Sequence, residues 1–198
     1  MSHMDHALWK LEEATAGSLS LVKAAHYGLR LASKRVADLA VSAAAAPDPA
    51  PGGPADLADL AAALETGPDQ LCDAVLLSLG DHFCAFLARA LGLERRPALP
   101  PTPEAVEALA GTPDALVEVP FWFSLALALY AAALNGGPLD QRTLGALGEP
   151  DLEIPYPTGK VKLFRVGDRV TLAESHFQEI AEAYLAAARA IRQRLATS

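Results

Sequence analysis

A cluster of helix-breaking residues is the feature that most constrains how this chain can fold. Four prolines and two glycines fall within Pro47–Pro54, a segment that a regular helix is not expected to cross. The part before it is too short to bury a core of its own, so we expect a single helical domain over 1–198. The sequence therefore predicts an N-terminal helical arm over 5–46, a Pro/Gly linker over 47–55 and a bundle core over 56–198.

The arm is rich in alanine, and its other residues divide into two faces at helical spacing. The basic face carries Lys23, Arg30 and Lys34. The apolar face carries Val22, His26, Leu29, Val36 and Leu39. Gly17 and Ser18 are the expected place for a break between two helices, because glycine weakens a helix interior.

A recurring pattern marks the helices of the core, namely a capping residue followed by proline at the first helical position. The pattern occurs at Gly67-Pro68, Thr102-Pro103, Thr112-Pro113 and Gly137-Pro138. It predicts helices over 68–92, 103–110, 113–134 and 138–147. The run from Val119 to Leu139 is uncharged, but its continuously apolar part ends near Leu134. These ~16 apolar residues fall short of the ~20 that span a bilayer, so we expect a helix buried on all sides.

A short β-hairpin is predicted over 160–172. Gly167-Asp168 suit the central positions of a type II′ turn, and strand-forming residues flank them. We expect Val161 and Leu163 to face the bundle and the cationic side chains of the hairpin to face solvent.

The chain ends in an amphipathic helix that Thr171 and Glu174 open as a capping box. Apolar residues recur along one face of this helix at helical spacing. The elements together predict a mainly α protein, a single-domain bundle of about six or seven helices with one small β-hairpin before the C-terminal helix. Its expected core is Val75, Leu79, Phe83, Leu87, Phe121, Phe123, Leu127, Phe177, Ile180 and Tyr184.

The two cysteines, Cys72 and Cys84, fall on one predicted helix, where they would lie ~18 Å apart at 1.5 Å per residue. A disulfide needs Cα atoms within about 4.4–6.8 Å, so both are expected to be free, buried thiols. Such thiols, together with an N-terminus that lacks an apolar signal core, indicate a cytoplasmic protein. Ser2-His3-Met4 resembles a cloning junction and is set aside.

Charge and motifs exclude several classes of function. The net charge of −8 disfavours general binding to nucleic acids and anionic membranes, because a negative surface repels phosphate groups. The sequence contains neither of the common glycine-rich phosphate loops and no Gly-x-Ser-x-Gly nucleophile elbow. We therefore expect no cofactor and favour no catalytic residue.

His26 and His82 are weak candidates for metal ligands. Neither histidine has a partner at the spacing of a helical metal site, and neither cysteine lies in a Cys-x-x-Cys motif. Ligands can also converge from separate helices of a bundle. We favour the ordinary alternative, a hydrogen-bonded histidine in a helical core, and expect no metal.

Lys160, Lys162, Arg165 and Arg169 form a cationic cluster on the predicted hairpin of an otherwise acidic chain. These residues are the candidate binding surface for an acidic partner or a phosphate backbone. The alternative is a solvated strand edge, since exposed lysines prevent edge-to-edge association.

Arg169 and His176 are separated by six residues, and Tyr184 follows on the same helix. This spacing is similar to the Arg-x(4–6)-His signature of the HEPN-type ribonucleases, a family of helical bundles. The resemblance implies that His176 is the acid or base in attack by the RNA 2′-hydroxyl and that Arg169 stabilises phosphate charge, usually across a dimer interface. The alternative places His176 on the surface, in the first turn of the last helix.

By elimination, we expect a non-catalytic protein that binds another protein, as immunity, adaptor and scaffold proteins do. Its acidic surface would steer it towards a basic partner. The long first helix and the Phe121-Trp122-Phe123 cluster are candidate surfaces for a homodimer. The alternative for the cluster is that its aromatic side chains fill the core, as such side chains more often do. A HEPN-like ribonuclease that uses Arg169 and His176 is the alternative function.

Overall fold

The computed structural model describes residues 3–44, 54–112, 116, 119–147 and 150–197. These residues form six α-helices and one two-stranded antiparallel hairpin, which comes before the C-terminal helix. The predicted fold class, mainly α with a small hairpin, is therefore confirmed. Residues 47–53 of the predicted linker and the predicted helix start at Pro113 lie outside the described residues.

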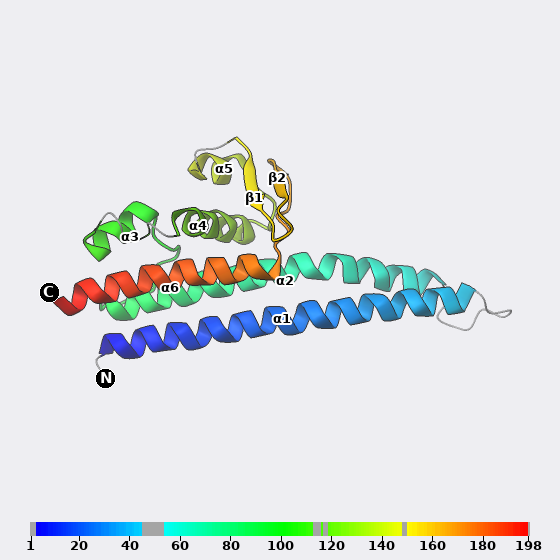
Figure 1. Ribbon diagram of the computed structural model, residues 1–198, viewed down its shortest axis with the longest axis horizontal. Helices are drawn as coiled ribbons and strands as arrows, with labels where there is room; N and C mark the ends of the chain where they lie inside the picture. The colour runs from blue at the N-terminus through cyan, green and yellow to red at the C-terminus, as the bar shows by residue number, and fades with distance from the viewer. Residues whose placement is uncertain (1–2, 45–53, 113–115, 117–118, 148–149, 198) are drawn as a thin grey trace.

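Two long helices, α1 (His3–Ala44) and α2 (Pro54–Ala90), run antiparallel along the whole molecule (Figure 1). The C-terminal helix α6 (Glu174–Thr197) lies on one half of this pair. Three shorter helices, α3 (Pro103–Ala110), α4 (Pro120–Leu134) and α5 (Gln141–Leu147), lie on the far side of α6 from α1. The bundle is therefore several layers deep at one end and two helices thick at the other.

Ion pairs mark how far α6 extends along α1. Arg192 bonds Asp5 at 2.5 Å near the chain ends, and Lys23 lies 3.5 Å from Glu174, where α6 begins. Past Lys23, α1 and the first part of α2 continue as a two-helix extension (Figure 1).

Several predicted helix boundaries are wrong. The helix expected to start at Pro68 begins at Pro54 and continues through Gly67-Pro68, because α1 packs along α2 and supports the backbone there. Gly17 and Ser18 do not break α1, and the Ser18 hydroxyl donates to the Ala14 carbonyl. The prediction for α3 is confirmed, with Thr102 as its cap.

The start predicted at residue 113 lies outside the described residues, and α4, the helix expected there, is described from Pro120. The start predicted at Pro138 is wrong. The helix expected from Pro138 is α5, which begins at Gln141 because the Asp140 carboxylate accepts a 2.6 Å hydrogen bond from the Thr143 amide.

The hairpin forms with a different pairing from the predicted one. Its strands are β1 (Leu152–Pro155) and β2 (Val161–Phe164), with Leu152 opposite Phe164. A turn does form at Gly167, where φ is +91° and the Asp168 amide donates to the Arg165 carbonyl. The chain after that turn pairs with Leu139 rather than with β2.

The side of the hairpin that faces the bundle also differs from the prediction. Leu152, Ile154 and Phe164 are buried, whereas Val161 is 60% exposed and Leu163 is 42% exposed. The new pairing causes this change, because β1 supplies the buried apolar residues that the prediction assigned to β2.

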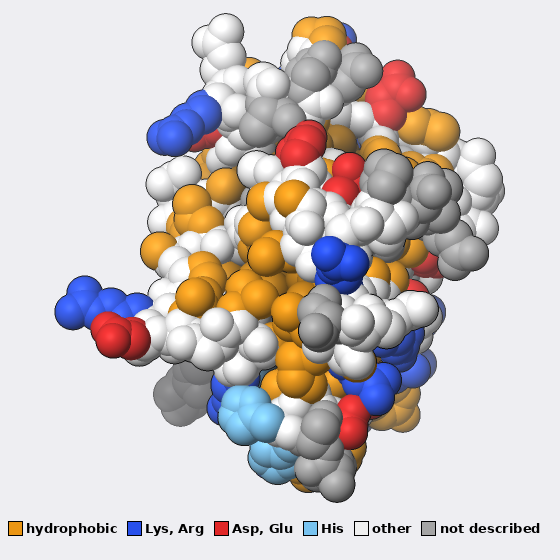
Figure 2. Space-filling model, turned by 90° about the vertical axis from the view of Figure 1, so that its left-hand side faces the viewer, with side chains coloured by type: hydrophobic (Ala, Val, Ile, Leu, Met, Phe, Trp, Pro, Cys, Tyr) orange, Lys and Arg blue, Asp and Glu red, His pale blue; other side chains and the backbone are white. Residues whose placement is uncertain are grey.

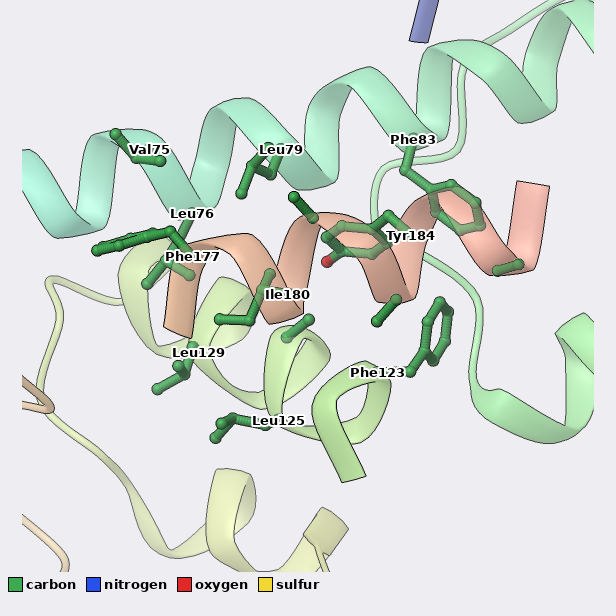
Figure 3. Packing of buried hydrophobic residues seen from close by; sticks show 14 of the residues in the cluster. Val75, Leu76, Leu79, Phe83, Phe123, Leu125, Leu129, Phe177, Ile180 and Tyr184 are labelled. Carbon is green, nitrogen blue, oxygen red and sulfur yellow. The ribbon is translucent and has the colours of Figure 1, made fainter. Parts of the chain in front are cut away.

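The main core lies where α2, α4 and α6 meet, as Figure 3 shows. Phe83, Phe123 and Tyr184 form a group of rings whose centroids lie 5.0–5.9 Å apart. Eight of the ten predicted core residues are buried, whereas Phe121 is 43% exposed and Leu127 is partly buried. The core is therefore predictable from helical periodicity except along α4.

Leu71–Ala90 of α2 is the one described segment long and apolar enough to cross a membrane by length and composition, and half of it is buried in the fold. A helix at the centre of a bundle passes the same test, so this segment says little about a membrane.

Candidate binding groove

A groove of about 600 Å³ lies between the segment that leads into α3, the helix α4 and the helix α5. Its floor comes from α4, where Leu127, Ala131 and Leu134 recur at three- and four-residue spacing and so share one face. Two lining leucines are exposed, Leu99 of the segment before α3 by 54% and Leu134 of α4 by 52%. Apolar surface is thus open to solvent here.

The groove corrects the expectation that α4 is buried on all sides. One side of α4 packs in the core through Phe123, Ala126 and Leu129, and the other side forms the groove floor. Figure 2 looks at the end of the molecule that carries α3 and both chain ends, and hydrophobic side chains form a broad patch across it.

Charged and polar side chains surround this apolar floor. Thr143 donates hydrogen bonds that lower the pKa of Asp140, and a hydrogen bond from Thr102 lowers the pKa of Glu104. Both carboxylates are therefore ionised at neutral pH, and Arg142 is the cation among the groove residues. This arrangement suits an apolar group that carries positive charge at its ends.

The back of the groove is tied to the central helix α2. The Tyr130 hydroxyl donates a 2.9 Å hydrogen bond to Asp81, which also lies 3.2 Å from the Arg96 guanidinium. Burial, together with Asp81, raises the pKa of Tyr130 to about 12, so the phenol keeps its proton. Gly80 permits this contact, because a Cβ at that position would overlap the Tyr130 ring.

The polar part of the groove lining consists of hydroxyls, carboxylates, one amide and one guanidinium. Among its described residues there is no histidine and no cysteine, and its hydroxyls are those of Thr102, Ser124, Tyr130 and Thr143. Three of these hydroxyls hydrogen-bond carboxylates, Tyr130 to Asp81, Thr143 to Asp140 and Thr102 to Glu104.

Arg169 connects the turn after β2 to α2 and to the segment that follows α4. Its guanidinium bonds the Asp73 carboxylate of α2 at 2.9 Å and the Gly136 carbonyl after α4. A side chain at Gly137, where φ is +100°, would collide with this guanidinium. Arg169 therefore joins the turn that follows β2 to the bundle.

His176 is 2% exposed, so the expectation of a surface histidine is wrong. Its Nδ1 accepts from the Ala173 amide at 3.0 Å, and its Nε2 donates to the Pro155 carbonyl at 2.9 Å. The rings of Trp122 and Tyr156 pack against it at 5.7 and 4.6 Å. Burial lowers the pKa of His176, and both ring nitrogens are occupied by structural bonds.

Arg169 and His176 thus belong to separate networks within the described residues, with no common partner. The HEPN resemblance requires the two side chains to act on one phosphate, and the contacts of each point to a structural role.

The other predicted binding residues mostly engage the protein itself. Lys162 donates to the Thr171 hydroxyl at 2.8 Å, and Arg165 lies 3.6 Å from Asp151. Lys160 is exposed in the loop between the two strands. The hairpin therefore presents fewer unengaged cations than its sequence suggests.

The weak metal candidates lie on different helices. His26 is half-buried on α1, and the His82 ring lies 3.4 Å from the Ser78 hydroxyl on α2. Within the part of the chain that the structure describes, no three His, Cys, Asp or Glu side chains gather as a metal site. Cys72 and Cys84 are buried thiols, as predicted, and burial raises the pKa of Cys84 to about 11.

Comparison with known proteins gave no significant match to a family model, to a curated protein or to a solved structure. Function is therefore inferred from geometry and charge. The sequence analysis did not predict the groove, because a helix without charged residues is normally interpreted as fully buried. The signal that could have revealed it is the run of small residues beside Leu127 and Leu134 on one face of α4.

Proposed function

We propose that this protein is a non-catalytic binding protein that holds an apolar segment of another protein in the groove between α3, α4 and α5. The observation that supports this proposal is a groove of about 600 Å³ whose apolar floor is open to solvent. Two of the leucines that line it, Leu99 and Leu134, are exposed. An apolar floor with a small number of polar groups around it is typical of recognition sites.

The charge around the groove specifies the partner further. Two carboxylates, Glu104 and Asp140, and one cation, Arg142, line the groove. The whole chain has a net charge of −8. A partner segment with lysine or arginine on either side of its apolar residues complements this surface and is steered towards it. Adaptor, scaffold and immunity proteins work by such contacts, and the two free thiols support placement in a reducing compartment such as the cytoplasm.

A peptide array tests this proposal. Immobilised peptides of leucine-containing segments flanked by lysine or arginine are incubated with the labelled protein. We expect binding to the wild type and at least tenfold weaker binding to Leu134→Glu, because a charge then occupies the groove edge. Leu93→Glu is the matched control, since Leu93 is exposed to a similar degree outside the groove. Equal binding by both variants would refute the groove as the site.

The array also tests the charge requirement. Replacing lysine and arginine by glutamate in the bound peptides should abolish binding, whereas Glu104→Gln should weaken it without loss of fold. Binding that ignores peptide charge would remove the argument for a basic partner.

The ribonuclease alternative makes a different prediction. It requires RNA cleavage that disappears in Arg169→Ala and His176→Ala at a temperature where both variants are folded. We expect no cleavage by the wild-type protein and a lower melting temperature in both variants, because each residue ties segments together.

A further inference from the structure

The face of α1 that points away from the bundle carries large apolar side chains. Trp9, Leu21, Tyr27, Leu31 and Leu39 are between 45% and 68% exposed. Leu11, Val22 and Val36, which are buried, mark the opposite side of the same helix. At about 100° per residue, the five exposed residues occupy roughly a third of the circumference of the helix. We call them, with the small residues between them, the outer face of α1.

The outer face is uncharged along its middle and charged at both ends. Between Glu13 and Lys34, helical spacing places only alanine, glycine, serine, leucine and tyrosine on it. Lys10 and Glu13 follow one another at its N-terminal end, and Arg35 and Asp38 follow in the same order at its C-terminal end. A basic residue therefore precedes an acidic one at each end.

Because of this order, the charges on two copies of the helix are complementary when the copies lie antiparallel. If a second α1 lies antiparallel with Ala24 opposite Ala24, Glu13 meets Arg35 and Lys10 meets Asp38. The same register sets Trp9 opposite Leu39 and Leu21 opposite Tyr27. Each charged contact and each apolar contact then occurs twice, as two-fold symmetry requires.

We propose that two copies of this chain associate through the outer faces of α1, antiparallel and with the two-fold axis beside Ala24. Tyr27 and Leu31 of one copy pack over the partner's Leu21 and Gly17, so large side chains meet small ones. Glycine and serine at these positions let the two helices approach closely. The exposed Lys10–Glu13 pair at 3.2 Å is weak enough to exchange for contacts across the interface.

Local charge favours this pairing despite the negative charge of each chain. Residues 21–44 contain four cations, Lys23, Arg30, Lys34 and Arg35, and one carboxylate, Asp38. The antiparallel register brings this basic half of α1 against the half that carries Glu13, whereas Lys23 and Glu12 pair with Glu174 and Arg189 of α6. Electrostatic complementarity of this kind fixes register more than it adds affinity.

The dimer would leave the binding groove open, since α3, α4 and α5 lie on the far side of α6 from α1 (Figure 1). Two grooves per assembly would let one dimer hold a partner that has two binding segments, which strengthens binding through a high effective concentration.

Sedimentation equilibrium tests the association. We expect the wild-type protein to sediment at twice the chain mass of 20.7 kDa and Tyr27→Glu to sediment as a monomer. Leu93→Glu, an equally drastic change outside α1, should stay dimeric. A monomeric wild type at about 0.1 mM, or a dimeric Tyr27→Glu, would overturn the proposal. The groove variant Leu134→Glu should remain dimeric, so the failure of either proposal can be seen separately.

Charge reversal tests the register. Glu13→Arg and Arg35→Glu should each weaken the dimer by about tenfold in dissociation constant, because two like-charge contacts replace two attractive ones. The double variant Glu13→Arg/Arg35→Glu should regain wild-type affinity. Additive weakening in the double variant would show that the two positions do not meet.

Disulfide trapping tests the axis. Ala24→Cys should form an intermolecular disulfide under mild oxidation, because the axis places each residue 24 beside its copy within reach of a disulfide. Ala16→Cys on the same face should not, since it lies opposite residue 32. The native Cys72 and Cys84 are buried and do not interfere. Trapping through residue 16 but not residue 24 would overturn the register.

Discussion

The two halves of the α1/α2 pair differ in what covers them. In one half, α6 and α4 complete the packing, and Phe83 on α2 is fully buried among other rings. In the other half, no third helix lies on the pair among the described residues, and Tyr27 on α1 is 68% exposed. The comparison teaches that one pair of long helices can combine a filled core with large apolar side chains that stay exposed.

Truncating one aromatic residue in each half gives the largest contrast. Phe83→Ala should lower the free energy of unfolding by about 3–5 kcal/mol, because a large cavity opens in a close-packed core. Tyr27→Ala should change the stability of the monomer by less than about 0.5 kcal/mol. Urea unfolding at low protein concentration measures both. Similar losses in the two variants would show that the halves do not differ.

Two helical glycines sharpen the same contrast with a smaller effect. Gly80→Ala should cost about 1–3 kcal/mol, because the new methyl group overlaps the Tyr130 ring. Gly28→Ala meets no atom within 4 Å and should stabilise α1 by up to about 1 kcal/mol through its helix propensity. Thermal unfolding of the two variants should therefore shift in opposite directions.

The covered half also contains His176, a buried histidine whose protonated form is disfavoured. Because burial lowers the pKa of His176 in the folded state, the unfolded chain binds a proton more readily below its ordinary value of 6.5. Stability should be complete above pH 6.5 and fall as pH drops towards the lowered pKa, by at most about 1.4 kcal/mol per pH unit. Urea unfolding between pH 8 and 5 measures this loss, which His176→Gln should lack.

Two buried tyrosines in the covered half differ in whether their hydroxyls find a hydrogen-bond partner. The Tyr184 hydroxyl finds no hydrogen-bond partner among the described residues, so Tyr184→Phe should be neutral or stabilising by up to about 1 kcal/mol. Tyr130→Phe removes a hydrogen bond to Asp81 and should cost about 1–2 kcal/mol. Destabilisation by Tyr184→Phe as large as that of Tyr130→Phe would reveal a partner for the Tyr184 hydroxyl.

The sequence predicts most of the core because helical periodicity directly reports which side chains face inward. Phe177, Ile180 and Tyr184 recur at helical spacing, and all three are buried. Periodicity fails on α4, where both sides are apolar and only the tertiary arrangement decides that one side packs in the core and the other lines the groove.

The hairpin shows a second limit of sequence analysis. Gly167-Asp168 correctly indicates a turn, yet local turn chemistry does not select the strand that pairs after it. Leu139, almost 30 residues upstream, takes that place. His176 was misplaced for a related reason, since its acidic neighbours in sequence suggested exposure, whereas its partner is the Pro155 carbonyl 21 residues earlier.

The contact between the first and last helices has a consequence for how the protein is made. Arg192 bonds Asp5, and Arg189 bonds Glu12, so residues almost at opposite ends of the chain meet. During synthesis, α1 and α2 can pair early through contacts between adjacent helices, but the side that α6 will cover stays open until α6 has been made. Newly made chains would therefore expose apolar surface for the time it takes to synthesise the segment from α3 to α6, a period in which a chaperone could bind them.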